Sequence, residues 1–253
     1  MNEAHKEAAT ALVLAAGRGE RMRPLTDVTP KPLLALGGMP LMAWHLRRLA
    51  QAGHQHVVVN TAWLENQVVA QIGPVWTDPH DPILKLAITY SMEGQDFGGA
   101  LETAGGIVRA LPHLAEVFWV VAGDVFAPDF SFSKHNMAAL AASGDRARLW
   151  LVPNPPHNPK GDFGLDHDRV LNMGAGDART RHTFSTVGLY KRSFFAPPVC
   201  ELPPGNPNGE RQALAPWLRH AMDLGWVSGE VFEQTWVDVG TPERLDELRK
   251  VYG

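Results

Sequence analysis

Residues 11–33 of the chain read ALVLAAGRGERMRPLTDVTPKPL, an apolar run that breaks into a glycine-rich loop. The apolar run predicts a buried strand over Ala11–Ala16. Gly17 and Gly19 follow this strand, and glycine lets a main chain adopt positive φ and approach a ligand closely. Backbone N–H groups of such a loop can contact phosphate oxygens. Four cations stand nearby, at Arg18, Arg21, Arg23 and Lys31.

The loop matches neither of the two common phosphate-binding motifs. The P-loop pattern GxxxxGK[ST] is absent, and the dinucleotide pattern GxGxxG is not completed. A kinase that depends on the Walker lysine is therefore disfavoured.

The remaining sequence alternates short apolar runs with segments of helical periodicity, which is typical of a mostly parallel sheet covered by helices. We therefore expect a Rossmann-like, three-layer α/β fold. The predicted helices are 41–52, 65–72, 102–111, 133–143 and 214–222, with a last helix that begins at Thr241. The predicted strands are 57–60, 86–90, 117–122, 148–152 and 235–239, and three short strands at 163–165, 170–173 and 184–190 predict a small β-containing lobe.

The composition argues against several classes of partner. The 253 residues contain 23 Lys and Arg against 27 Asp and Glu, a net charge of -4, so we expect no nucleic-acid partner. The longest uncharged stretch, residues 32–46, contains two prolines and is shorter than the ~20 apolar residues that a membrane span needs. Residues 1–10 lack the apolar core of a signal peptide. We expect a cytoplasmic protein with a flexible tail over 1–10 and a single domain over 11–253.

The glycine-rich segment and three later motifs resemble the sugar-1-phosphate nucleotidylyltransferases. The signature GxGxRMxPLT followed by PKP is matched at Gly17, Gly19, Arg21, Met22, Pro24, Leu25, Thr26, Pro30, Lys31 and Pro32. The later motifs are LETAGG at 101–106, Gly-Asp at 123–124 and WVDVGT at 236–241. The resemblance covers most of the chain except the tail. It implies the nucleotide-diphospho-sugar transferase type of α/β fold, with a sugar-binding lobe, in a monomer or small homo-oligomer.

Further segments are similar to the family members that act on N-acetylmuramic acid 1-phosphate in cell-wall recycling. These segments are AWL at 62–64, LETAGGI at 101–107, GDFGL at 161–165 and WVSGE at 226–230. The resemblance implies uridylyl transfer from UTP to this amino-sugar 1-phosphate. Mannose-1-phosphate guanylyltransferases and glucose-1-phosphate thymidylyl- or uridylyltransferases share the first motif and both aspartates, so these specificities stay open. A non-catalytic nucleotide-sugar sensor on the same fold is a further alternative.

The chemistry that the family performs joins two polyanions. The nucleophile is a sugar phosphate, which is already anionic at neutral pH, so the reaction needs no general base. It needs neutralisation of the phosphate charges and alignment of the two substrates. The resemblance assigns Arg21 to the β- and γ-phosphates and Lys31 to the α-phosphate or the sugar phosphate. It assigns Mg²⁺ to Asp124 and Asp238, because carboxylate oxygens suit a hard cation. Each aspartate follows an apolar strand, so we expect the two to meet at one sheet edge, although such aspartates are also common in turns.

The remaining candidate residues follow from the resemblance alone. The nucleotide is expected to contact the loop and the base pocket at Leu14, Ala15, Ala16, Gly17, Arg18, Gly19, Glu93, Gly94, Thr103 and Ala104. Residues 95–100 (QDFGGA) look like an enlarged loop, which leaves the alignment of Glu93 open between a base contact and a loop carboxylate. The family's Glu-Lys-Pro sugar segment is missing, so the sugar candidates are only Gly164 and Thr186, for which a structural role is equally open.

Overall fold

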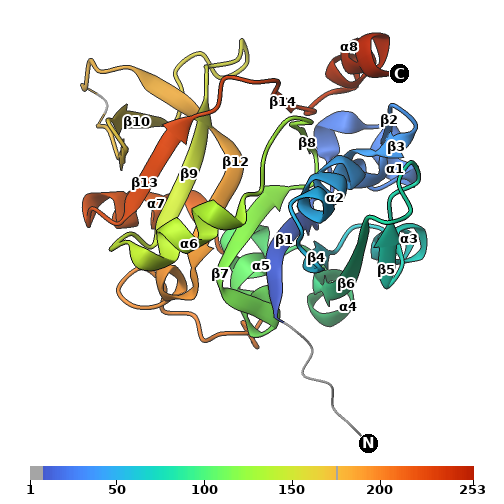
Figure 1. Cartoon of the computed structure of the whole chain (residues 1–253), viewed down its shortest axis with the longest axis horizontal. Coiled ribbons are helices and arrows are strands. Elements are labelled where there is room, and N and C mark those ends of the chain that lie inside the picture. The colour runs from blue at the N-terminus through green and yellow to red at the C-terminus, as the bar shows by residue number, and fades with distance from the viewer. Residues whose placement is uncertain (1–7, 175) are drawn as a thin grey trace, which may run out of the picture.

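A computed structural model describes residues 8–174 and 176–253 (Figure 1). Its centre is a ten-stranded sheet with strand order β10-β11-β13-β9-β12-β7-β1-β4-β6-β5, and two two-stranded sheets pair β8 with β14 and β2 with β3. The strands are β1 Ala9–Ala15, β2 Ala35–Leu36, β3 Met39–Pro40, β4 His56–Thr61, β5 Val75–Thr77, β6 Lys85–Met92, β7 Leu114–Ala122, β8 Val125–Phe126, β9 Ala147–Val152, β10 Phe163–Asp166, β11 Arg169–Leu171, β12 Arg181–Lys191, β13 Val227–Val231 and β14 Val237–Asp238. The α-helices are α1 Leu25–Val28, α2 Leu41–Gln51, α3 Glu65–Ile72, α4 Glu93–Phe97, α5 Glu102–Ala110, α6 Lys134–Ala142, α7 Leu214–Asp223 and α8 Pro242–Tyr252.

The sheet is parallel around its first strand and mixed at its other end. Strand β1 lies parallel to both β4 and β7, and β4 lies parallel to β6. Strand β12 runs antiparallel to both β7 and β9, and it joins the two halves of the sheet. The predicted α/β fold is confirmed.

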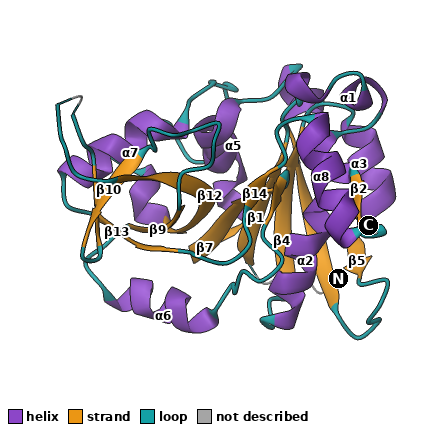
Figure 2. Ribbon diagram, turned by 90° about the horizontal axis from the view of Figure 1, so that it is seen from above, coloured by secondary structure: helices purple, strands orange, loops and turns teal. Residues whose placement is uncertain are grey.

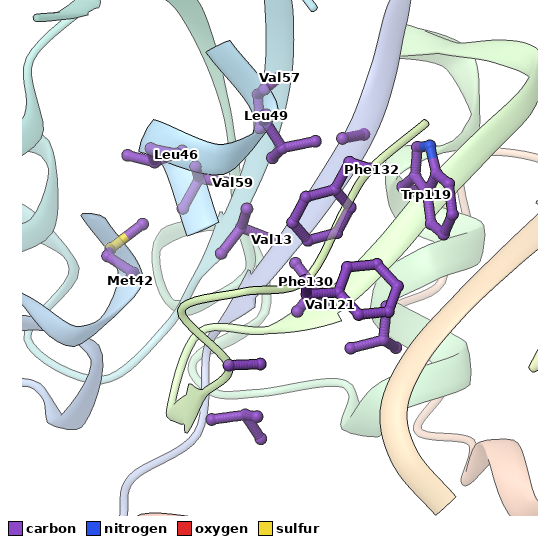
Figure 3. Close-up of a cluster of buried hydrophobic side chains, with 14 of the residues drawn as sticks. Val13, Met42, Leu46, Leu49, Val57, Val59, Trp119, Val121, Phe130 and Phe132 are labelled. Atoms are coloured by element: carbon purple, nitrogen blue, oxygen red, sulfur yellow. The ribbon is translucent and has the colours of Figure 1, made fainter. Parts of the chain in front are cut away.

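Alternate residues of the central strands face opposite layers, because successive side chains in a strand point to opposite faces. Val13, Val59 and Val121 belong to a core cluster that includes α2 and α6, whereas Leu12 and Val58 belong to a cluster that includes α5 and α7. Seen from above, helices cover both faces of the sheet (Figure 2). The first cluster contains an aromatic group in which Trp119 of β7 packs edge-to-face against Phe130 and Phe132 of the loop after β8 (Figure 3).

Local sequence explains how the helices begin and end. Helix α2 turns Met42, Leu46 and Leu49 toward the sheet, at the spacing of an amphipathic helix. Gly53, whose φ is +80°, follows its C-terminal end, where His54 N donates a backbone hydrogen bond to Leu49 O. This is the Schellman arrangement that a glycine favours. At α8 the Thr241 side chain accepts a hydrogen bond from Arg244 N, so the predicted N-cap is confirmed.

Several predicted boundaries differ from the structure. Strand β1 begins at Ala9 rather than Ala11, and residues 1–7 of the predicted tail lie outside the described residues. The segment predicted as an enlarged loop begins inside α4, whose five residues are too few to show helical periodicity. Strand β12 is longer than predicted, and it pairs with β7 and β9 of the central sheet as well as with β10.

Strand β13 was not predicted as a strand at all. Its sequence, Val227–Val231, contains Gly229 and Glu230 and therefore lacks a continuous apolar run. Pairing with β9 decides its conformation. Among the described residues, no helix is both long and apolar enough to cross a membrane.

Candidate active site

The glycine-rich loop folds back over the side chain of Lys31. Gly19 has a φ of +67°, and a Cβ added to it would lie 3.0 Å from Cβ of Lys31. The Thr26 hydroxyl donates a 2.8 Å hydrogen bond to Gly19 O and closes the loop. Gly17 meets nothing within 4 Å of an added Cβ. Of the two glycines, Gly19 is therefore the one that the conformation requires.

Lys31 is a buried cation with an acidic partner. It lies in a short 3₁₀ turn, Lys31–Leu33, between two prolines, and its exposed fraction is 6%. Its Nζ lies 2.5 Å from Oδ2 of Asp124. A buried charge is costly unless it is paired. The PKP segment thus holds an ammonium group directly beside the first predicted metal ligand.

The two predicted metal aspartates meet, but not as neighbouring ends of the central sheet. Asp124 precedes β8 and Asp238 ends β14, and these short strands pair antiparallel so that Asp238 lies opposite Val125. Val239 N also donates a 3.3 Å hydrogen bond to Asp124 O. The backbones of the two aspartates are therefore brought together by a separate two-stranded sheet. Asp124 follows the central strand β7, as expected, whereas Asp238 lies on β14, which pairs only with β8.

The His45 imidazole contacts the backbone of this short sheet at Val125. It is fully buried, and its Nε2 lies 2.7 Å from the carbonyl oxygen of Val125, which can only accept a hydrogen bond. Burial lowers the pKa of His45 to about 4, against a smaller opposing effect of the hydrogen bond. The side chain is therefore neutral at physiological pH and acts as a donor that fixes the strand next to Asp124.

Asp238 lies in a cluster of cationic and polar groups. Its Oδ2 lies 3.1 Å from Nη1 of Arg244 and 3.5 Å from Nε2 of His157. A Cβ added to Gly240 would lie 3.0 Å from Oδ2 of Asp238 and 3.2 Å from Nη2 of Arg21. The exposed Arg21 of the signature and the second aspartate thus both lie next to Gly240.

Arg18 is held by an aromatic ring. Its guanidinium carbon lies 3.7 Å from the centre of the Trp63 ring, and Trp63 Nε1 donates a 2.8 Å hydrogen bond to Thr26 O. Arg18 also lies 3.5 Å from Glu20 and 3.6 Å from Asp27. The AWL segment therefore orders one cation of the loop.

A first cavity, of about 220 Å³, opens at the ends of β1 and β7. Eight predicted site residues line it, namely Leu14, Ala15, Ala16, Gly17, Gly19, Lys31, Thr103 and Asp124. Asn60 and Glu102 also line it, and neither was predicted. The cavity lies where ligands bind in open α/β sheets, outside the carboxyl ends of parallel strands.

A second cavity, of about 530 Å³, adjoins the first and extends toward the antiparallel strands. The two cavities share Leu14, Glu102, Thr103 and Ala122. Thr186 and Tyr190 of β12, Phe163 of β10 and Arg219 of α7 are among the residues that line only the second cavity. The two predicted sugar candidates therefore separate: Thr186 lines this cavity and Gly164 does not.

Gly164 has a structural role instead. A Cβ at this position would overlap the Met173 sulfur, so the glycine allows close packing of the edge strands. Thr186 has a φ of +63°, a conformation that an L-residue with a branched side chain rarely adopts. Backbone strain of this kind persists where surrounding structure holds it, and such positions cluster at functional sites.

Glu93, Gly94 and Ala104, which were predicted in the base pocket, line neither of these two cavities. Glu93 is completely buried, and its carboxylate accepts hydrogen bonds from Asn60 Nδ2 at 2.7 Å and Leu101 N at 2.8 Å. Asn60 Oδ1 in turn accepts a 2.8 Å bond from Ala15 N. Glu93 thus positions the cavity wall from behind, because its side chain turns into the core.

Gly94 and Ala104 also lie behind the wall of the first cavity. A Cβ at Gly94 would lie 2.5 Å from Ala62 O, so the glycine permits close approach of two backbones. Ala104 is buried on α5, and its N–H donates to Gln212 O at 2.9 Å. Of the two residues predicted in the LETAGG motif, Thr103 and Ala104, only Thr103 lines the cavities.

The structure contains three functional candidates that sequence reasoning missed. Asn60 is a polar residue at the end of an apolar strand, which is a usable signal. Arg244 follows the WVDVGT motif by three residues, within reach of Asp238 once α8 is recognised. Arg219 gives no sequence signal, because one arginine on an amphipathic helix is ordinary.

The Asp124 and Asp238 carboxylates can hold a metal ion only if a bound substrate or water supplies the other ligands. Among the described residues there is no group of three or more His, Cys, Asp or Glu side chains that could hold a metal. The ion pairs of Asp124 and Asp238 engage Oδ2 of each carboxylate. Mg²⁺ is commonly bound through one or two carboxylates plus substrate phosphates and water, so this donor pair suits that ion.

Comparisons with known proteins agree with the geometry. A family model described as nucleotidyl transferase matches residues 10–252. The chain is 44% identical over 247 residues to the N-acetylmuramate alpha-1-phosphate uridylyltransferase of Neisseria meningitidis serogroup B, covering 96% of this chain and 98% of that protein. It is 30% identical to the protein of the same name from Caulobacter vibrioides, with 92% of each chain covered.

A solved structure is similar over nearly the whole chain. It is from Bacillus anthracis, is assigned to the glucose-1-phosphate thymidylyltransferases and contains sucrose. The TM-score is 0.75 at 18% identity, with 96% of this chain and 94% of that chain covered. At this identity the similarity concerns the fold alone.

Proposed function

The chain belongs to the nucleotidyl transferase family, and from this premise we propose that it transfers the uridylyl group of UTP to N-acetylmuramic acid 1-phosphate. The products are the UDP-sugar and pyrophosphate. The 44% identity to the Neisseria uridylyltransferase over 98% of that protein supports the choice of both substrates. The corresponding role is peptidoglycan recycling, in the cytoplasm where UTP is available.

The reaction is a displacement at the α-phosphorus of UTP. An oxygen of the sugar 1-phosphate attacks, a new P–O bond forms, and the bond to the leaving pyrophosphate breaks. The attacking oxygen is already anionic, so the protein needs no base. Its task is to hold two polyanions in line and to neutralise their charge.

The cations of the glycine-rich segment carry out this task in our proposal. Arg21 holds the β- and γ-phosphates through its planar guanidinium, and Lys31 contacts the α-phosphate or the sugar phosphate as a compact charge. Gly17 and Gly19 let the loop backbone approach the triphosphate. Ala15 and Ala16 offer backbone groups to the base, with Thr103 on the opposite wall.

Asp124 and Asp238 would hold Mg²⁺, which neutralises phosphate charge and favours departure of pyrophosphate when it is bound. Lys31 and Arg244 compensate these carboxylates in the absence of other cations. We further propose that residues 11–253 act as one domain, since strands from both halves of the chain belong to a single sheet.

The single observation that carries the proposal is the junction of the two cavities beside the Lys31–Asp124 pair. One cavity follows the glycine-rich loop, the other extends into the antiparallel strands, and two substrates must react where such cavities meet. Cations at that junction are what phosphoryl chemistry requires.

The test is pyrophosphate release in a matrix of substrates with Mg²⁺. UTP, dTTP, GTP, CTP and ATP are each combined with the 1-phosphates of N-acetylmuramic acid, N-acetylglucosamine, glucose and mannose. We expect the highest kcat/KM for UTP with the muramyl sugar, and loss of turnover in Asp124→Asn. A preference for GTP with mannose, or for dTTP or UTP with glucose, would replace the substrates and keep the mechanism.

A nucleotide-sugar sensor without catalysis is the alternative from another class. Retention of Arg21, Lys31, Asp124 and Asp238 argues against it, because a sensor could lose its metal ligands and keep its fold. Binding of UTP without any pyrophosphate release over the whole matrix would favour the sensor.

A further inference from the structure

The second cavity contains a cation for which the transfer chemistry has no use. Arg219 lies on α7 and lines this cavity. Its guanidinium carbon lies 5.0 Å from the centre of the Phe163 ring, and its Nη1 donates a 2.9 Å hydrogen bond to Asn172 Oδ1. Asn172 is held in turn, since its Nδ2 lies 3.1 Å from both carboxylate oxygens of Asp223. A ring and an amide therefore orient the guanidinium.

Part of the guanidinium is available to a ligand. The contact with Asn172 uses Nη1, and Nε and Nη2 make no hydrogen bond with any residue that the structure describes. Arginine presents its donors in a planar fork that matches a carboxylate or phosphate. Arg219 can therefore bind an anionic group in the cavity without giving up the contact that orients it.

The other charged residues of this cavity do not compete for that role. Among the described residues that line it, Arg219 is the only cation, and the acidic ones are Glu102 and Asp162. Asp162 already accepts hydrogen bonds from Asn158 Nδ2 at 3.2 Å and Phe184 N at 2.8 Å. Glu102 lies at the junction with the first cavity. A second anionic group of a bound sugar, distant from its phosphate, is thus attracted at Arg219.

The wall of the cavity also carries an unpaired hydroxyl. Tyr190 is completely buried and lines the cavity, and its hydroxyl has no hydrogen-bond partner among the described residues. A buried polar group without a partner is unfavourable unless a ligand or water satisfies it. Because Tyr190 has no exposed surface, its hydroxyl lies behind the cavity wall, and Arg219 is the cation that a ligand in the cavity can reach.

The proposed sugar carries two separate anionic groups. N-Acetylmuramic acid 1-phosphate has its phosphate on C1, and a lactyl ether on O3 that ends in a carboxylate. Its phosphate must reach Lys31 at the first cavity, which directs the rest of the sugar into the second cavity. The lactyl carboxylate is the group that distinguishes this sugar from N-acetylglucosamine.

We infer that Arg219 binds the lactyl carboxylate and thereby determines the specificity for the muramyl sugar. The inference rests on the proposed function. A site that is built to bind a charged group discriminates against the analogue that lacks it, because the site's own charge is then left unpaired. Arg219 contributes to binding and selection of the sugar and takes no part in the bond changes at phosphorus.

The experiment compares two sugars in two proteins. Kinetics with UTP are measured for wild type and Arg219→Gln, using the 1-phosphates of N-acetylmuramic acid and N-acetylglucosamine. We expect kcat/KM for the muramyl sugar to fall about 10- to 100-fold in the variant, mainly through KM, as for loss of a charge-assisted hydrogen bond. The value for N-acetylglucosamine 1-phosphate, or its inhibition constant if turnover is absent, changes less than about threefold.

A chemical variant of the substrate separates recognition from structure. With the lactyl carboxylate converted to its amide, wild type loses the same factor, whereas Arg219→Gln is indifferent to the change. Arg179→Gln is the matched control, because this exposed arginine pairs with Asp177 and lines neither cavity. Thermal unfolding of each variant checks that the fold is intact, and Arg219→Lys is expected to retain part of the preference.

Each outcome has one meaning. Equal losses for both sugars would overturn the inference and leave Arg219 with a structural role, and so would an unchanged preference in the variant. If wild type has no activity with the muramyl sugar but uses another sugar, the proposed function fails first, and the inference fails with it. The wild-type measurement alone separates these two failures.

Discussion

The Nζ atom of Lys31 and Oδ2 of Asp124 lie 2.5 Å apart, although 93 positions of the sequence separate the two residues. The lysine side chain is nearly buried, and about a third of the aspartate side chain is exposed, at 8% and 34%. The pair therefore faces the first cavity through its acidic member. The ammonium group lies just behind, where it can neutralise a phosphate that approaches Asp124.

Replacement of Lys31 by methionine keeps the length of the side chain and removes its charge. We expect kcat/KM for pyrophosphate release to fall by about 100- to 1,000-fold, the effect of losing one preorganised electrostatic contact. Lys250→Met, at an exposed position of α8, is the control and should retain wild-type activity. A Lys31→Met enzyme within a few-fold of wild type would show that this lysine does not act on the phosphates.

The two glycines of the loop differ in what they tolerate. Gly19→Ala places a Cβ 3.0 Å from the Lys31 Cβ at a φ of +67°, so we expect destabilisation of about 1–3 kcal/mol together with lower activity. Gly17→Ala meets nothing within 4 Å and should leave the free energy of unfolding nearly unchanged. Denaturant unfolding of both variants measures the difference, and equal effects would contradict the structural argument.

Glu93 is expected to make stability depend on pH. Burial raises the pKa of this carboxyl above its ordinary value of 4.5, against the opposing hydrogen bonds from Leu101 and Asn60. The pKa of Glu93 is therefore higher in the folded state than in the unfolded state. Its contribution to stability is fully present below pH 4.5 and is lost as the pH rises through the pKa of the folded state. Glu93→Gln removes this dependence.

The measurement is the free energy of unfolding of wild type minus that of Glu93→Gln, from urea titrations at several pH values. We expect this difference to decrease from acidic to neutral pH. Glu116→Gln, at an exposed position of β7, should show no such trend. A difference that increases with pH would mean that the hydrogen bonds outweigh burial.

Glu102 occupies a backbone conformation that favours glycine, with a φ of +58°. We expect Glu102→Gly to increase stability by up to about 1 kcal/mol, through relief of backbone strain, and to raise Tm by about 2–4 °C for a chain of this size. Glu102→Ala keeps the strain and serves as the control. Equal gains in both variants would mean that the carboxylate, and not the backbone, is unfavourable.

Much of the secondary structure follows from local patterns. The amphipathic spacing of α2 and its stop at Gly53, and the apolar run of β7, are set by residues close together in the chain, and their predictions agree with the structure. Strand β13 and α4 were missed because their conformations depend on pairing and burial that local patterns do not contain.

The sequence by itself determined the parts of the site that lie within one segment. The order of Gly17, Gly19 and Lys31 is enough to predict a phosphate-binding loop, because its geometry depends on φ angles and on neighbours a few residues away. The two aspartates were likewise recognisable from their flanking motifs. They were expected to meet at one sheet edge, but the pairing of β8 with β14 that brings their backbones together was not predicted.

Only the tertiary structure decided which distant side chains act together. It turned Glu93 away from the cavity to hold Asn60, and it brought Asp238 to Asp124 through a separate pair of strands. It also brought Arg219 into the wall of the second cavity. The physical reason is that burial and charge pairing depend on distance in space, and the packing of a whole sheet with its two helical layers sets those distances.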